Sequence, residues 1–573
     1  MKNTKVIKIG ASKVINTTLT QGKKAIKLSP STAKFIKQTL RNYIKTNYER
    51  EYRLLQYDYD NFIQYQSWIK NNTPGNDEVD KIKKEIIGFK KKPKFSIILP
   101  IYKTPPDLLK ECIDSVVNQY YENWEICIVD DNSSDKDLVK ICGDYQKLFK
   151  EKFKYKNRKA NGHISLASND AVKMSSGEYI VLLDHDDLLW PNALYEIAKE
   201  INKSEEYDFY YTDEDMIDIN GHHNHPYAKP PFMQALLNGC NYITHMAVIK
   251  TEIFDTIGGF RKGVEGAQDW DLFLRISEQT KKIKHVPKMV YSWRMIAEST
   301  ALKGFDAKPY AYEAQKKSFV DHQKAIGLPI KDAHLYRGFI GWMAIYDLGK
   351  ETINLDIIID KYSDNRKIRD MVGQIEKDIS PNVIPTYFIV GYSKLRIRAS
   401  NIIPSNRKFV TLKNIRQYTD KSDQADYVFY SRDLAGIHTV NGWLSYTIGI
   451  LKYEKYDALA TSLRHTNHNC ESAGVKLSGK IRKKLLQDYV EGSSKRTDIS
   501  LLAPREVDAV DPRAFISRRE YFEDIIGESE KTDSLRVYYI PFIKCFINDE
   551  NKDQTSIKKI IKPLDIANDY TAA

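Results

Sequence analysis

Short apolar runs alternate with stretches of helical periodicity in the first part of the chain. Residues 95–100, 124–129 and 179–183 are almost entirely apolar, which is typical of strands buried on both faces of a sheet. Residues 107–119 and 165–174 place apolar side chains three or four positions apart, which predicts helices. This alternation of strands and helices predicts an α/β fold with a mostly parallel sheet and right-handed crossovers.

Acidic side chains follow two of these apolar runs. Asp130 and Asp131 come after the second run, and Asp184 and Asp186 come after the third. Because ligands of parallel sheets bind beyond the carboxyl ends of the strands, we expect both clusters to meet in one crevice. Asp184 and Asp186 are one residue apart on an extended strand end, so they point the same way and can hold Mg²⁺ or Mn²⁺ against a diphosphate. The alternative is an acidic turn that caps the helix near Pro191.

Several classes of protein are disfavoured by motifs that the sequence lacks. No GxGxxG follows the first apolar run and no GxxxxGKS or GxxxxGKT occurs, which disfavours a dinucleotide site and a P-loop. No stretch approaches the roughly 20 apolar residues that span a bilayer, and the N-terminus has no uninterrupted apolar core, so we expect neither a membrane span nor a signal peptide; a transit peptide is the alternative. The six cysteines form no CxxC pair, which indicates neither a zinc site nor a disulfide framework and favours a reducing, cytoplasmic compartment.

The positive charge of the chain is concentrated at its front end. Residues 1–50 contain 12 Lys and Arg against one acid, Glu49, which accounts for +11 of the net charge of +12. The balanced remainder argues against a nucleic-acid binder, and we expect the arm to meet an anionic surface. Residues 31–70 have helical periodicity and many tyrosines, which predicts a helical hairpin packed on the next domain or a helix lying on a membrane. A break at residues 72–76 helps to delimit this basic helical region, 1–90.

Further motifs continue the pattern beyond the third apolar run. Together with the acidic clusters they stand in one order along the chain: 96–102, 130–135, 161–169, 177–187, 266–272 and 291–301. In this combination the chain resembles the family 2 glycosyltransferases with a GT-A fold, in particular enzymes that build polysaccharide, O-antigen or capsule. The resemblance covers about residues 93–325, and we place the catalytic domain at 91–335.

The resemblance assigns a nucleotide-binding role to residues after the first two strands. Pro100 and Tyr102 lie in the loop where the family seats the nucleotide base. Asp131, together with Asp130, would accept a hydrogen bond from the base ring, and Arg158 is a candidate contact to the nucleotide. The donor implied is a nucleotide-diphosphate sugar, with a UDP-sugar preferred.

The resemblance also assigns the metal and the general base. Asp184 would lie near the ribose and, with Asp186, would bind Mn²⁺ or Mg²⁺. Asp269 matches the base that takes the proton from the acceptor hydroxyl in an inverting displacement. The acceptor implied is a growing surface glycan or a lipid-linked glycan. Four further residues are donor-side or acceptor-side candidates: Gln268, Trp270, Trp293 and Arg294.

The chain departs from the family pattern at two positions. Gln268 stands where many relatives have Glu, and Ser292 stands where many relatives have a His that helps to hold the metal. The third metal ligand is therefore open, and His285 is more simply interpreted as structural. Residues 222–225, rich in His, are interpreted as an exposed loop near the acceptor side, and 212–215 as the floor of the crevice.

The C-terminal third repeats the apolar runs without the acidic pair. Residues 355–359, 386–390 and 426–430 resemble the strands of the first fold, but Gly391 and Arg432 stand at two of the strand ends. Such internal repetition predicts a second, degenerate GT-A-like α/β domain at 340–573 without a metal site. One acid, Asp433, remains and cannot clamp a diphosphate alone. Packing, acceptor binding or formation of a homo-oligomer are the expected roles, and a second working transferase is the alternative.

Two other functions fit the sequence less well than glycosyl transfer. A sugar-phosphate nucleotidyltransferase would carry a Gly-rich first loop with Arg or Lys, whereas residues 100–106 read PIYKTPP. A non-catalytic scaffold would have lost the acids in both halves. We expect the enzyme at the cytoplasmic face of the cell membrane, bound peripherally through residues 1–50, because anionic lipids attract basic segments by about 1 kcal/mol per Lys or Arg.

Overall fold

The structure is a computed structural model of the 573-residue chain. It describes residues 62–295 except 64, 204 and 205; 310–335; 341–391 except 363 and 364; 404 and 406–464 except 423 and 433; 470–472; 505–507; 510; 513–526; and 535–547. The basic arm, most of the predicted helix at 31–70, Asp433 and the motif at 299–301 lie outside these residues. Among the described residues, no helix is long and apolar enough to cross a membrane.

The chain divides into two compact units, 1–72 and 73–573. In the first unit, described residues 65–72 are helical, and Tyr65 stacks on Trp68 with ring centroids 5.6 Å apart. The second unit contains both large sheets. The domain boundaries after 90 and near 335–340 stay predictions.

The first sheet begins with the predicted alternation of strands and helices. Its elements are α4 (Asn76–Ile87), β1 (Phe95–Ile101), α5 (Pro106–Val117), β2 (Trp124–Asp130), α6 (Lys136–Phe149), β3 (Phe153–Asn157), α7 (His163–Met174) and β4 (Tyr179–Leu182). The strands at β1, β2 and β4 and the helices at α5 and α7 were predicted. Asp135 caps α6 by accepting the amide hydrogen of Asp137 over 2.8 Å, which satisfies a donor at the helix start.

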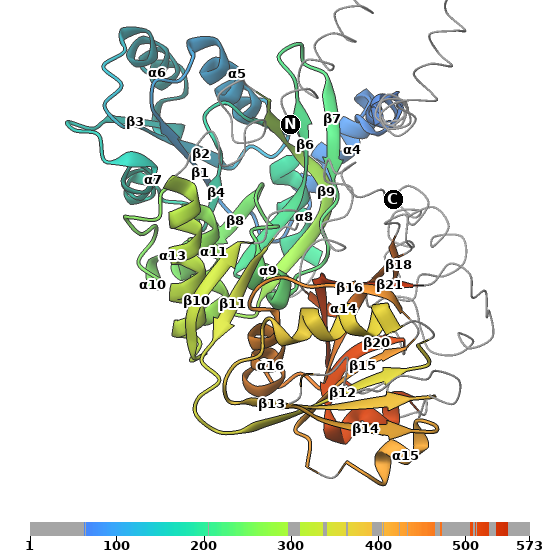
Figure 1. The fold of residues 1–573 in the computed structure, drawn as a ribbon. Coiled ribbons are helices and arrows are strands. Elements are labelled where there is room, and N and C mark those ends of the chain that lie inside the picture. The colour runs from blue at the N-terminus through green and yellow to red at the C-terminus, as the bar shows by residue number, and fades with distance from the viewer. Residues whose placement is uncertain are drawn as a thin grey trace, which may run out of the picture. The chain divides into compact units, whose positions relative to one another are not determined.

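The sheet continues with elements that change its direction. They are β5 (Leu188–Leu189), α8 (Ala193–Lys203), β6 (Phe209–Ile217), β7 (His223–Tyr227), α9 (Gln234–Gly239), β8 (Ala247–Lys250), α10 (Thr251–Thr256), α11 (Gln268–Gln279), β9 (Ile283–Arg294) and α13 (Tyr310–Ala325). The strand order is β3-β2-β1-β4-β8-β6-β9-β5, with β7 beside β6. The pairs of β1 with β2 and β4 are parallel, whereas β8 is antiparallel to both β4 and β6. The sheet is therefore mixed, with a parallel half that carries the predicted strand ends (Figure 1).

The register explains why those strand ends meet. Ile101 at the end of β1 pairs with Asp130 at the end of β2, and Ile98 pairs with Leu182 at the end of β4. The acids after β2 and β4 thus leave the sheet at the same edge. Strand β2 is buried along its whole length, as expected for a parallel strand covered on both faces.

A hairpin separates the first sheet from the second. It comprises β10 (Ile330–Leu335) and β11 (Trp342–Tyr346). Trp342 stacks on Phe319 of α13 with centroids 6.2 Å apart. On its other side the hairpin meets α16 (Trp443–Tyr453), where a Cβ on Gly449 would lie 2.1 Å from the Tyr346 ring. Glycine is therefore needed for this close approach.

The second sheet repeats the strand order of the first. Its elements are β12 (Ile353–Asp360), α14 (Asn365–Glu376), β13 (Val383–Val390), β14 (Lys408–Leu412), α15 (Arg416–Thr419), β15 (Tyr427–Arg432), β16 (Leu434–His438), β17 (Ala458–Arg464), β18 (Cys470–Ser472), β19 (Arg505–Val507), β20 (Ala514–Arg518), α18 (Phe522–Ile526) and β21 (Val537–Ile547). The order β14-β13-β12-β15-β20-β17-β21-β16, with β18 beside β17, matches the order of the first sheet, and one additional strand, β19, pairs with β21. Parallel and antiparallel pairings also agree, because β15 and β17 are both antiparallel to β20, as β4 and β6 are to β8.

Candidate functional site

A cavity lies at the carboxyl edge of the first sheet and collects residues from several loops. Pro100 comes from the end of β1, Asp184 from the segment after β4, His245 from the segment before β8, and Gln268 and Asp269 from the start of α11. The remaining walls are mainly apolar: Ile98, Ile164, Ser168, Leu182, Leu183, Thr244 and Phe260. The structure therefore brings the predicted base and one predicted metal ligand into one cavity.

Asp269 lies in the first turn of α11. Burial raises the pKa of its carboxyl group, and the nearby Asp184 raises it further, while His245 and the amide of Trp270 lower it. Asn241 donates its Nδ2 hydrogen to Asp269 Oδ2 over 2.7 Å. A carboxylate with a raised pKa, held by one side-chain donor, is a stronger proton acceptor than an exposed aspartate, as general base catalysis requires.

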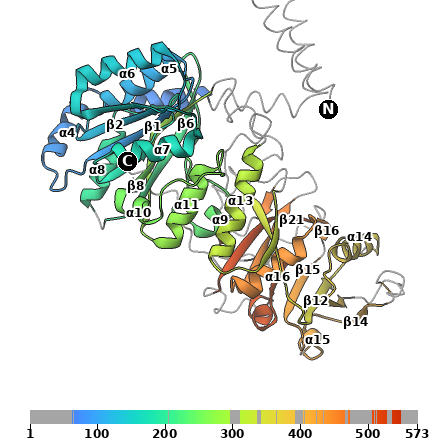
Figure 2. The ribbon, with the colours of Figure 1, turned by 90° about the vertical axis from the view of Figure 1, so that its left-hand side faces the viewer.

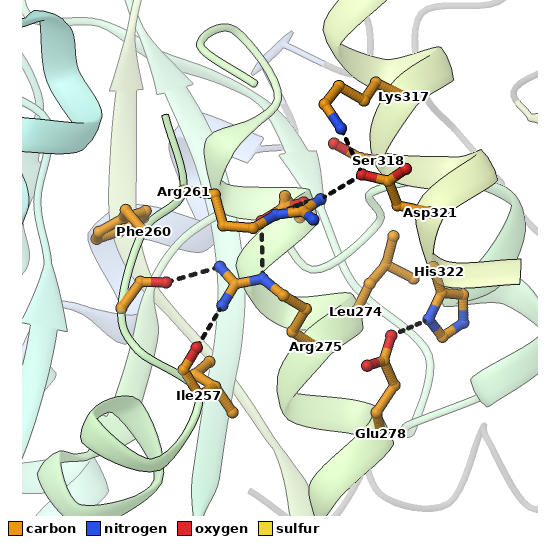
Figure 3. Close-up of polar contacts among 12 residues, drawn as sticks. Ile257, Phe260, Arg261, Leu274, Arg275, Glu278, Lys317, Ser318, Asp321 and His322 are labelled. Carbon is orange, nitrogen blue, oxygen red and sulfur yellow. Dashed lines mark hydrogen bonds and ion pairs between the residues drawn. The ribbon is translucent and has the colours of Figure 1, made fainter. Parts of the chain in front are cut away.

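An ion-pair network fixes the start of α11 (Figure 3). Asp271 is buried, and its carboxylate accepts both from Arg261 Nε, over 3.0 and 3.1 Å, and from Arg275 Nε over 2.9 Å. Arg275 also donates to the carbonyl of Gly259 over 2.7 Å, which ties the helix to the loop after α10. Arg261 further pairs with Asp321 of α13 over 3.0 Å. Because Asp271 is two residues from Asp269, this network holds the turn of α11 that carries the predicted base.

Helix α13 extends this support along α11; Figure 2 shows the two helices side by side. His322 Nδ1 lies 2.6 Å from Glu278 Oε1, near the far end of α11. Lys317 pairs with Asp321 over 2.6 Å, next to Arg261. The helix that carries the predicted base is thus linked to α13 directly at Glu278 and, through Arg261, at Asp271.

The acidic segment after β4 forms a turn rather than an extended strand end. Strand β4 stops at Leu182, and the amide of Asp187 donates to the carbonyl of Asp184 over 3.2 Å. A turn of this kind brings residues three apart together, so the two-residue spacing of Asp184 and Asp186 no longer places them on one face. The ligand atoms of Asp184, Asp187 and His245 lie within 4.8 Å of one another, and this is the one such group of three among the described residues.

Asp187 is completely buried beneath the turn. Its Oδ2 accepts from the Tyr291 hydroxyl over 2.5 Å and its Oδ1 from the Arg294 amide over 2.8 Å. Burial raises the pKa of Asp187, and the neighbouring Asp186 and Asp184 raise it further. Asp186 stands outside the group of three, and its carboxylate lies 3.5 Å from the imidazole of His185.

Two positions considered for a third metal ligand face elsewhere. Ser292 Oγ donates to Asp215 over 2.6 Å and accepts from the Trp190 indole over 2.8 Å. His285 is buried with Nε2 2.8 Å from Asp213 Oδ1 and stacks on Tyr211, which agrees with a structural role. The nitrogen in the group of three comes instead from His245, which nothing in the local sequence pattern marks.

The nucleotide side of the predicted site centres on Asp131. Its Oδ1 pairs with Arg158 Nε over 2.9 Å, and the amide of Gly162 donates to the same carboxylate over 2.9 and 3.1 Å. A Cβ on Gly162 would lie 2.6 Å from the Arg158 guanidinium, so glycine allows this contact. Arg158 also pairs with Asp170 over 2.7 Å, and its predicted contact to the nucleotide would therefore have to share these partners.

Asp130 and Tyr102 border the same region. Asp130 Oδ1 accepts from the Ser133 amide over 2.9 Å and from its hydroxyl, whereas Oδ2 is buried without a hydrogen-bond partner in the described part of the chain. The amide of Lys103 donates to Ser133 Oγ over 2.8 Å, which joins the loops after β1 and β2. Tyr102 is 43% exposed, and Lys103 Nζ lies 5.2 Å from the centre of its ring.

The structure places the four remaining candidates unequally. Gln268 lines the cavity, and Trp293 meets His245 edge to face with centroids 5.9 Å apart. Trp270 is a core residue, because it is 2% exposed and its indole donates to the Leu237 carbonyl over 2.8 Å.

The side chain of Arg294 is hydrogen-bonded to the backbone of the acidic turn. It is 3% exposed, and its guanidinium donates to the Asp186 carbonyl over 2.7 Å and to Glu111 over 2.6 Å. Arg294 therefore braces the turn, and a contact of Arg294 to the donor or acceptor stays a prediction.

The His-rich segment is a strand and not the exposed loop that its composition suggested. Residues from His223 onward form β7, which pairs with β6. His223 Nδ1 lies 2.8 Å from Asp215 Oδ2, and its ring packs edge-on against Trp190 at 5.3 Å. The carboxylate of the neighbouring strand explains this histidine without a metal ion.

Comparison with known proteins agrees with this geometry. Residues 96–261 match the family model described as glycosyl transferase family 2. The chain is 41% identical over 232 residues to the uncharacterized protein y4gI of Sinorhizobium fredii, which covers 40% of this chain and 25% of the relative. It is 30% identical to the O-antigen biosynthesis protein RfbC of Myxococcus xanthus, over 42% of this chain and 19% of the relative. It is 31% identical to a chondroitin synthase of Pasteurella multocida, over 38% of this chain and 22% of the relative.

The family match includes most of the residues that line the cavity, whereas Gln268 and Asp269 lie beyond it. The alignments extend over no more than a quarter of the length of any of the three relatives. The family match covers β1, β2, β4 and the acidic turn, in the order in which the structure assembles them. Residues 96–261 are therefore similar to glycosyl transferase family 2.

Proposed function

We propose that the chain is a metal-dependent, inverting glycosyltransferase that moves a sugar from a nucleotide-diphosphate sugar to a hydroxyl of a growing surface glycan. The observation that carries this proposal is the shared cavity of Asp269, whose pKa is raised, and of Asp184 and His245 from the group of three. A proton acceptor and a candidate cation site on either side of one cavity are what glycosyl transfer from a diphosphate leaving group requires.

The residues of the group of three fit a divalent cation. Carboxylate oxygens suit both Mg²⁺ and Mn²⁺, and imidazole suits transition-metal ions, so Asp184, Asp187 and His245 would hold Mn²⁺ well. When bound, the cation would neutralise the charge of the departing nucleotide diphosphate.

Asp269 then acts on the acceptor. Asn241 holds its carboxylate, which takes the proton of the acceptor hydroxyl while the oxygen forms a bond to the anomeric carbon. The bond from that carbon to the diphosphate oxygen breaks, and its electron pair leaves with the nucleotide. Attack opposite to the leaving group inverts the anomeric centre.

The donor is proposed to be a UDP-sugar and the acceptor a polysaccharide chain. The buried, unpartnered Oδ2 of Asp130 and the exposed ring of Tyr102 support a nucleobase at the ends of β1 and β2. Similarity to family 2 and relatives named for O-antigen biosynthesis and chondroitin synthesis support a glycan acceptor.

A nucleotide-release assay tests the function. The full-length chain is incubated with a panel of UDP-, GDP- and dTDP-sugars, with and without Mn²⁺, and released nucleotide is measured. We expect Mn²⁺-dependent release from one donor, and its loss in Asp269→Asn when acceptor is present. The absence of release from every donor, with and without the metal, would contradict the proposal.

We also propose that residues 1–50 bind the enzyme to anionic membranes. The support is their net charge of +11 in a chain that is otherwise balanced. Deletion of the arm should weaken sedimentation with anionic vesicles and leave donor hydrolysis unchanged. Equal vesicle binding by the truncated chain would contradict this role.

A further inference from the structure

Residues 241–246 form a segment that lines the cavity and also contacts Asp269. It precedes β8 and contributes Thr244 and His245 to the cavity wall. At its other end Asn241 donates to the base, Asp269, over 2.7 Å. One short segment therefore contacts the general base and supplies a member of the group of three.

A buried carboxylate from β6 holds this segment. Glu214 Oε2 accepts from the Thr244 hydroxyl over 2.7 Å and from the His245 amide over 3.0 Å. Glu214 is 2% exposed, so these bonds are protected from water. Two successive residues of the segment are thus fixed by one oxygen atom.

Lys229, in the loop after β7, contacts both Glu214 and the segment. Its side chain is fully buried, with Nζ 3.2 Å from Glu214 Oε2. The ammonium also donates to the Ile243 carbonyl over 2.6 Å and to the His245 carbonyl. A buried charge is tolerated when it is paired and hydrogen-bonded, and Lys229 Nζ is paired with Glu214, bonded to two carbonyls of the segment, and 5.6 Å from the centre of the Tyr227 ring.

The imidazole ring is held on its other side. His245 stacks on Tyr291 with centroids 4.6 Å apart and an interplanar angle of 11°. The hydroxyl of Tyr291 donates to Asp187, another member of the group of three. Tyr291 therefore aligns the imidazole and a carboxylate, while Glu214 and Lys229 fix the backbone that carries the imidazole.

We propose that His245 is the nitrogen ligand of the divalent cation and that Glu214, paired with Lys229, is its positioning residue. This inference rests on the proposed function. It supplies the ligand that Ser292 cannot, since Ser292 is turned toward Asp215. An imidazole ligand makes the site prefer Mn²⁺ to Mg²⁺, because Mg²⁺ favours oxygen ligands and retains its water.

Metal binding to the full-length chain tests the assignment. Mn²⁺ is titrated into the protein while free Mn²⁺ is followed by electron paramagnetic resonance, and Mg²⁺ is added as a competitor. His245→Gln should weaken Mn²⁺ binding by about tenfold or more with a smaller effect on Mg²⁺, and Glu214→Gln should weaken it to a lesser extent. His334→Gln is the matched control, because His334 lies exposed on β10.

A second measurement detects the ligand nitrogen directly. Pulsed electron paramagnetic resonance of the wild-type protein with Mn²⁺ should show a ¹⁴N coupling from an imidazole, and His245→Gln should remove it. Unchanged Mn²⁺ affinity in His245→Gln, an equal loss for both metals, or no ¹⁴N coupling would overturn the assignment. Mn²⁺-dependent nucleotide release without ¹⁴N coupling would overturn this assignment and leave the proposed function standing, whereas no release from any donor would overturn the function itself.

Discussion

The two sheets of this chain share a strand order but end in different chemistry. In the first sheet, carboxylates follow the strands that pair with β1, and one of these residues, Asp184, lines the cavity. In the second sheet, Arg432 pairs in register with Asp360 at the equivalent edge. Asp360 accepts from the Tyr430 hydroxyl over 2.6 Å and lies 3.8 Å from Arg432. A buried core preserves the order of strands, whereas a few residues past the strand ends decide whether a site exists.

The buried acids within the two sheets differ in their partners. Glu125 of β2 is held by Lys94 over 2.6 Å and Lys154 over 2.9 Å, whereas Asp356 of β12 accepts from hydroxyls, including that of Tyr418 over 2.9 Å. Burial acts against ionisation of Glu125, yet its partners outweigh burial and lower its pKa to about 2. Burial raises the pKa of Asp356, and its hydroxyl partners offset this only in part.

The largest expected effect is a loss of turnover on a change in the first sheet that a change in the second sheet does not cause. Asp269→Asn removes the proposed proton acceptor and should lower kcat by about 10²–10⁴-fold, with UDP affinity retained. Asp360→Asn, the matched change in the second sheet, should leave turnover intact. Steady-state kinetics and UDP titration measure both. A folded Asp360→Asn protein that loses turnover to the same extent would show that the second sheet carries chemistry.

The next effect concerns stability. Glu125→Gln leaves two lysines without their buried partner, and because these lysines reach solvent we expect a loss of about 2 kcal/mol in the free energy of unfolding at pH 7. Asp356→Asn should cost less, because it keeps neutral hydrogen bonds to hydroxyls. Denaturant unfolding compares the two.

The contribution of Glu125 to the free energy of unfolding should depend on pH. The folded pKa of Glu125 lies below the ordinary 4.5, so its contribution is present above pH 4.5 and is lost as the pH falls toward 2. The difference between wild type and Glu125→Gln should shrink over this range. A difference that is constant from pH 7 to pH 3 would contradict the pairing argument.

A smaller loss of kcat is expected from a change that displaces Asp269 without replacing it. Asp271→Asn weakens the contacts to Arg261 and Arg275, and we expect kcat to fall about tenfold with little change in the KM for the donor, because a small displacement of a reacting group is costly. Asp332→Asn, which breaks an exposed ion pair to Lys316, is the control and should be silent. Equal kcat in both variants would remove the network from the account of catalysis.

The smallest effect is a shift of the pH profile. Because burial raises the pKa of Asp269, the acid limb of kcat/KM should lie above the ordinary aspartate value of 3.8. Asn241→Ala removes a hydrogen bond to the ionised carboxylate, so the limb should move upward by about one pH unit. A limb that stays in place, or moves downward, would contradict the assignment of Asp269 as the base.

The sequence predicted the parts of the site that follow from strand patterns. The apolar runs predicted β1, β2 and β4, and the acids after β2 and β4 leave the sheet at one edge. The cavity is lined by Asp184 but not by Asp130 or Asp131, so a single crevice for both acidic clusters stays a prediction. Strand β3 was missed because it lies at the sheet edge and only Phe153 is fully buried, so the chain there lacks a continuous apolar run.

Other parts could not be predicted because they depend on contacts distant in sequence. The two-residue spacing favoured Asp184 and Asp186, but β4 ends early and a turn brings Asp187 to Asp184 instead. His245 stands in a segment without periodicity, and its position depends on Glu214, 31 residues earlier. The partners of the acids in β6 are likewise invisible to local patterns.

We propose that the two sheets share one topology but that only the first sheet forms a nucleotide site. Calorimetric titration of UDP and Mn²⁺ into the full-length chain tests it most directly. We expect one equivalent of UDP per chain, with binding lost in Asp131→Asn and unchanged in Arg432→Ala. Two equivalents per chain, or binding that survives Asp131→Asn and disappears in Arg432→Ala, would contradict it.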